Sequence, residues 1–438
     1  MDLKYSLRSM LLLGFTAAAV AACGSTSSST STSSSAAPAS SAATSASSGT
    51  SAAASASSGT TATGSPIKIG NISPVSGVLA YPGVAAAVKA AVRDVNDHGG
   101  IAGHPIDLIF CDEASDPNKA AACARTMVSN HVAATVGDFS PTGEQNITPI
   151  LAAGKIPQIG TFAFSTALSD PYNFLLVGAQ PGVDAASAYQ AKLAGKKWGA
   201  AVLDIAISQA YTKYFGSVAA SSGATMTVAK SPITATDVSS SASTLAAAKP
   251  DIIILLTTGQ QATQIALDAK QLGYTGKFVV DLQAYSASTV GQIAPVAGQT
   301  VFASQLPPVS ASTQYPALNQ FFSDMKAEAA SGDSGAAVTP KFVQDSTVDG
   351  WLAVIALQKI AGAASATTSS AILTAFRSAK NVPLGLIASW TPNKPGPAAF
   401  PRISNTTYYF DKLDSSGTMV LASPPSADVA SLLGSSRG

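Results

Sequence analysis

Short apolar runs alternate with longer stretches of helical periodicity along most of this chain. The apolar run at 67–72 is followed by a turn and then by an Ala/Val-rich stretch, 84–96, whose apolar residues recur every three or four positions. A glycine pair ends that stretch, and a second apolar run follows at 106–110. This order predicts strand, helix and strand, the unit of a parallel sheet with helical crossovers.

The alternation continues and then restarts in a second half. Further strands are expected at 133–137, 156–160 and 173–177, and then at 199–203, 226–229, 251–256 and 277–281. The unbroken apolar run at 251–256 indicates a strand buried on both faces of its sheet. Later helices are expected at 317–329, 347–361 and 370–379, before a terminal hairpin of 407–413 with 419–422. The pattern predicts an α/β fold with two Rossmann-like lobes, each a parallel sheet flanked by helices.

Polar and aromatic residues follow these strands in both halves. Parallel sheets bind ligands beyond the carboxyl ends of their strands, so such residues are candidates for a shared pocket. The candidates are Ser76, Tyr81, Phe139, Ser140, Thr142, Phe162, Ala163, Phe164, Ser208, Thr258, Asp281, Gln283 and Tyr285. Core packing remains the alternative for the phenylalanines, and helix capping or turn formation for the hydroxyl residues.

The N-terminus has the composition of an export signal. Lys4 and Arg8 precede an apolar core at 10–20, and small residues then lead to Cys23. This resembles a bacterial lipobox, in which residues 1–23 form a lipoprotein signal peptide and Cys23 is lipidated. An ordinary secretory signal with an incidental cysteine is the alternative. Residues 24–65 are all Gly, Ala, Ser, Thr or Pro, so a disordered tether to the membrane is expected.

Composition and motifs argue for binding rather than catalysis. The net charge is +1 with 11% charged residues and no basic run, which gives no indication of a nucleic-acid partner. The sequence contains no G-x-S-x-G elbow, no phosphate-binding loop and no H-E-x-x-H. His98, His104 and His131 have no zinc-site spacing. We therefore expect no enzyme activity, no cofactor and no metal.

Two further cysteines lie close together in the sequence. Cys111 ends a predicted strand and Cys123 lies in the helix that follows. The oxidising environment of an exported protein favours a disulfide between them. Metal binding is the alternative, but it lacks two further ligands.

A resemblance to a known family rests on three short motifs. They are Ser76-Gly77 in the first loop, the pattern N-x-x-G-G-I-x-G from Asn96, and Asp116-Pro117 after the second strand. Together they resemble type I periplasmic solute-binding proteins of the leucine/isoleucine/valine-binding group of ABC importers, over about residues 67–422. In that family the loops matching 140–142 and 162–164 hold the α-carboxylate and α-amino groups of an amino acid. This sequence departs from it at Thr258, where an aromatic residue is usual, and near Asp281, which lies beside the acidic position.

The resemblance implies a three-segment hinge and a division of the chain. Residues 66–181 with 304–384 would form the N-terminal lobe, 182–303 with 385–424 the C-terminal lobe, and 425–438 a flexible tail. The implied protein is a monomeric, extracytoplasmic solute-binding lipoprotein that captures a small amino acid or a related carboxylate or amide. Its partners would be the solute, ABC permease subunits and the cell membrane. A ligand sensor without transport and a structural surface lipoprotein are the alternatives.

Overall fold

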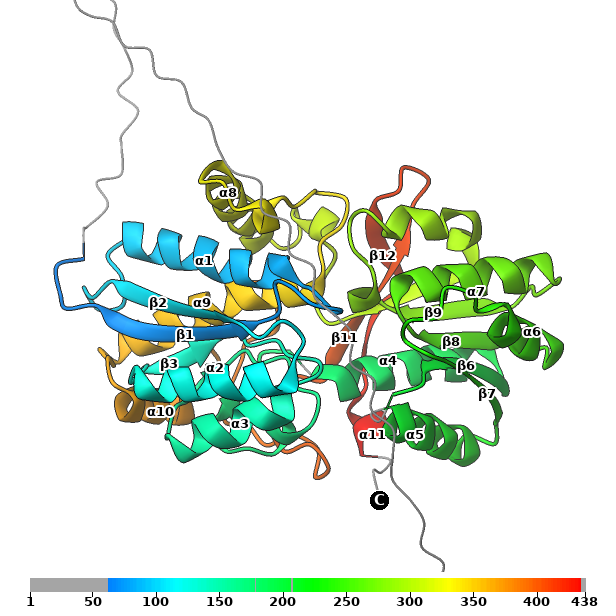
Figure 1. The fold of residues 1–438 in the computed structure, drawn as a ribbon, viewed down its shortest axis with the longest axis horizontal. Coiled ribbons are helices and arrows are strands. Elements are labelled where there is room, and N and C mark those ends of the chain that lie inside the picture. The colour runs from blue at the N-terminus through cyan, green and yellow to red at the C-terminus, as the bar shows by residue number, and fades with distance from the viewer. Residues whose placement is uncertain (1–61, 178, 206–207, 435–438) are drawn as a thin grey trace, which may run out of the picture. The chain divides into compact units, whose positions relative to one another are not determined.

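The computed structural model describes residues 62–177, 179–205 and 208–434 (Figure 1). The signal peptide, Cys23 and residues 24–61 of the expected tether lie outside these ranges. None of the helices within them has the length and hydrophobicity that a membrane span requires.

The first sheet has five strands in the order β2-β1-β3-β4-β5. Every neighbouring pair in it is parallel. The strands are β1 (Ile67–Ser73), β2 (Ile106–Asp112), β3 (Ala134–Val136), β4 (Gln158–Ile159) and β5 (Asn173–Phe174). The chain order reverses between β1 and β3, which places a crevice at the carboxyl ends of those two strands.

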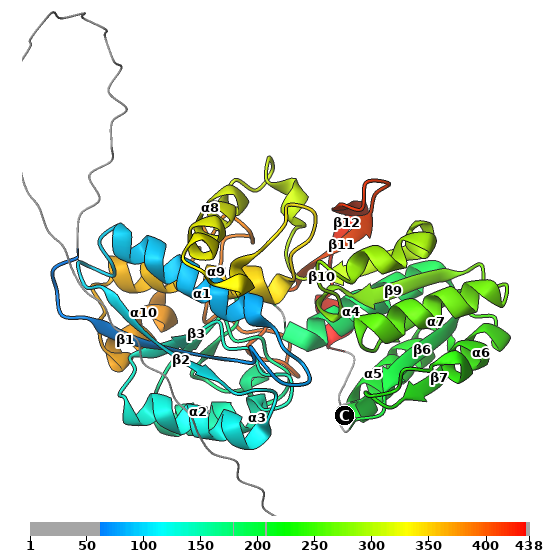
Figure 2. The same cartoon turned by 45° about the horizontal axis from the view of Figure 1, so that its top comes forward.

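Helices cover both faces of this sheet (Figures 1 and 2). One face packs against α1 (Pro82–Asp97), α8 (Ala317–Ala330), α9 (Asp345–Ala363) and α10 (Ser369–Ser378). The other packs against α2 (Pro117–Ser129) and α3 (Glu144–Ala153). Helix α9 approaches the strand ends closely, since a Cβ on Gly137 (φ +59°) would lie 2.8 Å from the Cα of Gly350.

The second sheet repeats the winding of the first. Its order is β12-β11-β10-β9-β8-β6-β7, and the strands from β6 to β10 pair in parallel. These are β6 (Lys197–Leu203), β7 (Thr225–Ser231), β8 (Ile252–Leu256), β9 (Lys277–Asp281) and β10 (Thr300–Ser304). The antiparallel hairpin of β11 (Thr407–Leu413) and β12 (Met419–Asp428) completes the sheet along β10.

The second sheet is also buried on both faces. Helices α4 (Ala179–Ala194), α5 (Ser208–Ser221) and α11 (Ala430–Leu433) share one core cluster with it. Helices α6 (Ser239–Ala247) and α7 (Gly259–Gln271), with the 3-10 segment η3 (Val290–Gln299), share the other. Side chains of β8 alternate between them, Ile252 and Ile254 on one face and Ile253 and Leu255 on the other. This confirms the burial expected of an unbroken apolar strand.

Three segments cross between the lobes, two of them later than the sequence suggested. The first crossing follows β5, as expected. The second was expected within 301–304, but these residues pair with β9 in β10, so the chain crosses only after Ser304. The third was expected at 387–390, but Trp390 forms a bridge with Val382 and is buried in the first-lobe core. The side chain of Trp390 therefore keeps this part of the chain in the first lobe.

The C-terminal segment is more ordered than the expected flexible tail at 425–438. Strand β12 continues to Asp428, which pairs with Thr407 at the start of β11. Helix α11 follows and buries Leu432 and Leu433 against the second lobe. The expectation was wrong for 425–434, because apolar residues beyond the proline pair fix this segment. Residues 435–438 lie outside the described ranges.

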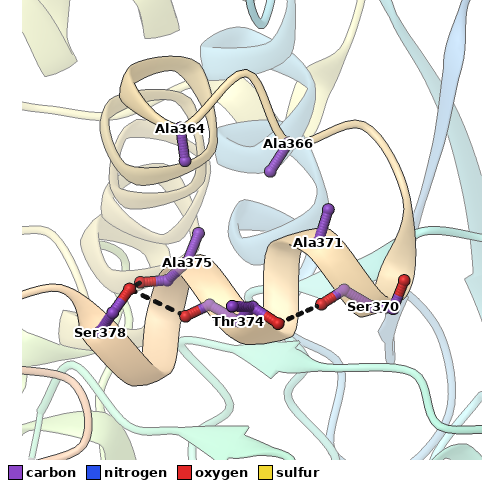
Figure 3. A pocket seen from close by; sticks show the side chains of 7 residues that line it. All are labelled: Ala364, Ala366, Ser370, Ala371, Thr374, Ala375 and Ser378. Carbon is purple, nitrogen blue, oxygen red and sulfur yellow. Dashed lines mark hydrogen bonds between the residues drawn. The ribbon is translucent and has the colours of Figure 1, made fainter.

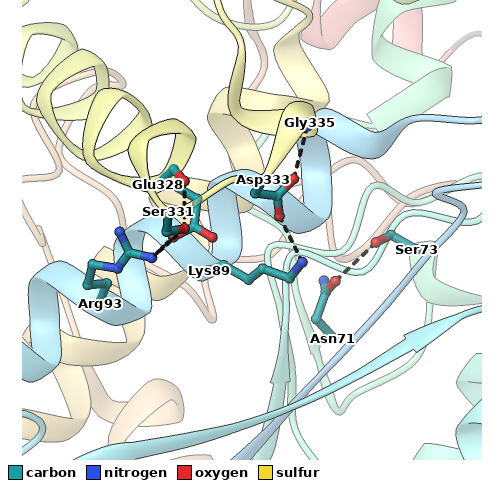
Figure 4. Close-up of polar contacts among 8 residues, drawn as sticks. All are labelled: Asn71, Ser73, Lys89, Arg93, Glu328, Ser331, Asp333 and Gly335. Atoms are coloured by element: carbon teal, nitrogen blue, oxygen red, sulfur yellow. Dashed lines mark hydrogen bonds and ion pairs between the residues drawn. The ribbon is translucent and has the colours of Figure 1, made fainter. Parts of the chain in front are cut away.

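Polar contacts join α1 to the end of α8 and to the turn that follows it, far away in sequence (Figure 4). Lys89 Nζ lies 2.8 Å from Asp333 Oδ2, and an Arg93 nitrogen lies 2.6 Å from Glu328 Oε2. Pairs at such partly exposed positions each contribute about 0–1 kcal/mol. They supplement the apolar packing that holds this layer together.

The predicted disulfide is present. Cys111 in β2 and Cys123 in α2 are bonded, with their Cα atoms 5.7 Å apart. The bond leaves neither thiol as a metal ligand.

Replacing both cysteines, Cys111→Ser with Cys123→Ser, is expected to lower the free energy of unfolding by about 2–3 kcal/mol. The bond closes a short loop and removes chain entropy from the unfolded state. Guanidinium unfolding measures the change, with reductant as the control. Wild type in reductant should match the double variant, and the double variant should not respond to reductant. Equal stability of wild type and variant without reductant would contradict this account.

Candidate functional site

A cavity of about 690 Å³ lies where loops from both lobes meet. Its walls are formed by residues that follow the strands of the two sheets. The first lobe contributes Val78, Leu79, Tyr81, Phe139, Pro141, Thr142, Glu144, Gln145, Phe162, Phe164 and Ser165. The second lobe contributes Gln180, Leu203, Ile205, Ser208, Ala210, Tyr211, Ile233, Leu256, Thr257, Thr258, Asp281, Gln283 and Ala284. This is the edge where parallel sheets bind ligands.

Four aromatic rings form the first-lobe wall. Tyr81 precedes α1, Phe139 follows β3, and Phe162 and Phe164 follow β4. The ring centroid of Phe139 lies 4.6 Å from that of Tyr81 and 5.1 Å from that of Phe162. A backbone bridge between Phe139 and Phe162 fixes the two loops to each other. The three phenylalanines are buried, so they form a preorganised apolar surface.

Glu144 holds one of these loops in place. Its two carboxylate oxygens accept hydrogen bonds from the backbone N–H groups of Ser165 (2.6 Å) and Ala167 (2.8 Å). They also accept from the hydroxyls of Ser165 and Thr166. Because these donors occupy the carboxylate, Glu144 acts on the cavity by positioning the 164–167 loop.

Three polar groups of the cavity wall make no hydrogen bond within the described chain. They are Thr142 Oγ1, Ser208 Oγ and Gln283 Nε2, all atoms removed from solvent. An unpaired buried hydroxyl or amide costs about 1–3 kcal/mol. The groups come from both lobes, so a molecule that hydrogen-bonds to all three would contact both.

Asp281 is the carboxylate of the second-lobe wall. Its Oδ1 accepts from Gln283 N at 2.9 Å, and its Oδ2 lies 3.3 Å from Gln180 Nε2. Burial raises the pKa of Asp281 to about 6. Burial also raises the pKa of Tyr81, and the Asp281 charge raises it further, so the first-lobe phenol and second-lobe carboxylate interact electrostatically. A cation bound at Asp281 would relieve its desolvation.

Four of the expected site residues do not line the cavity. Ser76 Oγ instead donates to Asp112 Oδ2 at 2.6 Å, and Ser140 Oγ accepts from Gly143 N at the start of α3. Ala163 is fully buried, and its carbonyl accepts from Gln180 N. Tyr285 is fully buried in the second lobe, where its ring lies 5.5 Å from that of Phe302. Their hydrogen bonds or packing contacts are made with other residues of the protein. The other nine expected residues line the cavity.

The sequence interpretation missed a large part of the wall. Most of the missed residues are apolar, such as Leu203 and Leu256, the last residues of β6 and β8. Their position at strand ends was the available signal. Gln180 lies just past the first crossing and carried no comparable signal. Val78, which is 80% exposed, and Ile205, 36% exposed, add apolar side chains from both lobes.

A second hollow, of about 410 Å³, lies between the C-terminal end of α9 and α10 (Figure 3). Its walls are alanines with Ser370, Thr374 and Ser378. The Thr374 hydroxyl donates to Ser370 O and the Ser378 hydroxyl to Thr374 O, along the helix itself. These two hydroxyls are already satisfied, which favours the inter-lobe cavity as the functional site.

The inter-lobe wall is suited to binding. It combines a broad apolar surface with a few polar groups from both lobes, as small-molecule pockets do. Within the described ranges, no cluster of three or more His, Cys, Asp or Glu residues is arranged to hold a metal ion.

Comparison with known proteins agrees with this architecture. A family profile described as periplasmic binding protein matches residues 66–399. A fatty acid ABC transporter substrate-binding protein from Thermomonospora curvata has a similar structure, with TM-score 0.68, 21% identity, and coverage of 85% of this chain and 95% of that one. A substrate-binding protein of an ABC transporter from Aeropyrum pernix gives TM-score 0.68, 16% identity and coverage of 85% and 99%.

The leucine-binding protein LivK from Thermotoga maritima is also similar, with TM-score 0.65, 18% identity, and coverage of 81% of this chain and 97% of that one. No curated protein matches the chain. The structural likenesses, all below 25% identity, show the fold, and the family match covers most of the two lobes. The chain belongs to the periplasmic binding protein family.

Proposed function

We propose that this protein is the extracytoplasmic solute-binding component of an ABC importer. The observation that carries the proposal is the inter-lobe cavity, where unpaired groups of Thr142, Ser208 and Gln283 lie beside an aromatic wall. A solute that bonds to both lobes stabilises the closed state, because closure is favoured only by contacts that require it. The permease would then recognise the closed form. Lipidated Cys23 would anchor the protein to the membrane.

The ligand we propose is a small amino acid or a related amide or carboxylate. Similar proteins are named for fatty acid and for leucine, so the choice must come from the wall of this cavity. That wall contains no Lys, Arg or His, so a ligand carboxylate would be held by hydroxyl and amide donors. Asp281 would hold an ammonium group. The ligand's apolar part would lie on the aromatic rings.

Thr142→Ala is expected to weaken ligand binding about fivefold to tenfold, the effect of about one hydrogen bond. It should not lower the free energy of unfolding, because Thr142 Oγ1 has no hydrogen-bond partner within the described chain. A thermal-shift screen of amino acids, amides and small acids finds the ligand, and calorimetry measures its affinity. Thr374→Ala, at an exposed position of α10, is the matched control and should bind normally. Normal affinity in Thr142→Ala would remove Thr142 from the site.

A ligand that carries an ammonium group should bind more tightly as the pH rises through about 6. That is where Asp281 loses its proton, and only the ionised carboxylate attracts a cation. In Asp281→Asn this pH dependence should disappear and affinity should fall. Ligands without an ammonium group should show neither effect. Calorimetric titrations across this range measure both, and an unchanged profile in the variant would assign the cation contact elsewhere.

A further inference from the structure

A buried carboxyl group lies where the chain crosses from the second lobe to the first. Ser304 ends β10, and Asp345 begins α9 in the first lobe. Asp345 Oδ2 accepts a hydrogen bond from Gln305 N at 2.6 Å, and Ser304 Oγ also contacts this carboxyl group. Asp345 therefore connects the crossing segment to α9.

The contacts of Ser304 are compatible with a proton on Asp345. Ser304 Oγ lies 2.7 Å from Leu306 O, 3.0 Å from Asp345 Oδ1 and 3.1 Å from Asp345 Oδ2. A hydroxyl has one hydrogen to donate, and the carbonyl can only accept. If that hydrogen goes to Leu306 O, the shortest of the three contacts, then the serine oxygen faces the carboxyl group with lone pairs alone. A proton on Asp345 turns this contact into a hydrogen bond and completes a chain from Asp345 through Ser304 to Leu306.

The surroundings of Asp345 favour the neutral form. The charge of Asp281 at the end of β9 acts on Asp345. Asp345 in turn acts on Asp349 one turn along α9, and on Asp411 and Tyr408 of β11. These neighbours are all acidic groups, and none of the ion pairs in the described chain includes Asp345. Burial, reinforced by Asp281, raises the pKa of Asp345 to about 7.

The same end of α9 also contacts the proposed ligand cavity. Gln344 Nε2 donates to Gln283 O at 3.1 Å, and Ser346 Oγ donates to Gln283 Oε1 at 3.3 Å. Gln283 lines the cavity and has an unpaired Nε2. Residues on either side of Asp345 therefore hold a wall residue of the cavity.

We propose that Asp345 is a proton-binding site at the lobe junction, and that its proton holds the crossing segment and the Gln283 wall of the cavity in the arrangement described. Loss of the proton places a charge beside three other carboxyl groups, and Asp345 and Leu306 O then compete for the single hydroxyl hydrogen of Ser304. The contacts of the start of α9 with the crossing segment and with Gln283 are then weakened. The proton site does not depend on the proposed solute, since each contact that defines it joins residues of the chain itself.

The direction of the pH effect follows from the raised pKa. The unfolded chain releases this proton near its ordinary value of 3.8, whereas the folded chain retains it up to about 7. The contribution to stability is therefore complete below about pH 4 and is lost as the pH rises through 7.

Asp345→Asn isolates this contribution. The asparagine amide can donate to Ser304 and accept from Gln305 N, so it mimics the protonated acid at every pH. The unfolding constants of variant and wild type should be similar near pH 4 and diverge by up to about tenfold per pH unit between about 5 and 7, with the variant more stable. Thr374→Ala, a neutral substitution at an exposed position of α10, is the control and should give a flat difference. A flat difference for Asp345→Asn would overturn the proposal.

Hydrogen exchange tests the link to the cavity without ligand. In wild type, the backbone amides of Gln305 and Gln283 should lose protection above about pH 7, after correction for the intrinsic rise of the exchange rate with pH. In Asp345→Asn the same amides should stay protected. Protection retained in wild type, or lost only at Gln305, would overturn the link. If the variant does not fold, carboxyl-carbon NMR of wild type should show an aspartate titrating near 7 that shifts in Ser304→Ala. Absence of such a resonance would overturn the proton site.

Discussion

The structure depends on one constraint, the parallel pairing of strands in two sheets that are wound in the same order. Parallel strands end at a common edge, and where the order reverses, the outgoing loops diverge to opposite faces. In the first sheet this happens between β1 and β3, and in the second between β6 and β8. The loops beyond these strands form the walls of the inter-lobe cavity. The strand order thus decides where a solute can be bound, and the loop residues decide which solute.

The cavity treats its two carboxylates in opposite ways. The Glu144 carboxylate accepts hydrogen bonds from backbone N–H groups and hydroxyls of the loop that it positions. Both of its oxygens are therefore occupied by partners within the protein. Asp281 accepts only two hydrogen bonds, one from the backbone N–H of Gln283 and a longer one from the side chain of Gln180. Its side chain remains partly exposed to the cavity. The difference comes from their neighbours, because both are acids of the same cavity wall. Glu144 therefore has a structural role, whereas Asp281 can still bind a ligand.

The start of α9 contacts both the segment that crosses between the lobes and the wall of the cavity. Its first residues hold the crossing after β10 through Asp345 and the cavity wall through Gln344 and Ser346. Farther along, Gly350 and Ala353 allow the helix to approach the strand ends of the first sheet at Gly137 and Gly160. A rigid helix with contacts at each of these places can transmit a change at the lobe junction to the solute site.

Local patterns along the sequence determined the elements and much of the site. Apolar periodicity located most strands and helices, because burial on one or two faces leaves a repeat of two or three to four residues. The positions just past the strands identified Thr142, Asp281 and Gln283, and the short separation of Cys111 and Cys123 identified their bond. Only the tertiary structure decided which loop side chains face inward. Tyr285 turns toward Phe302 and Ser140 toward the start of α3, while Thr142 and Asp281 face the cavity. The sequence could not show this, because side-chain direction is set by packing partners that are distant along the chain.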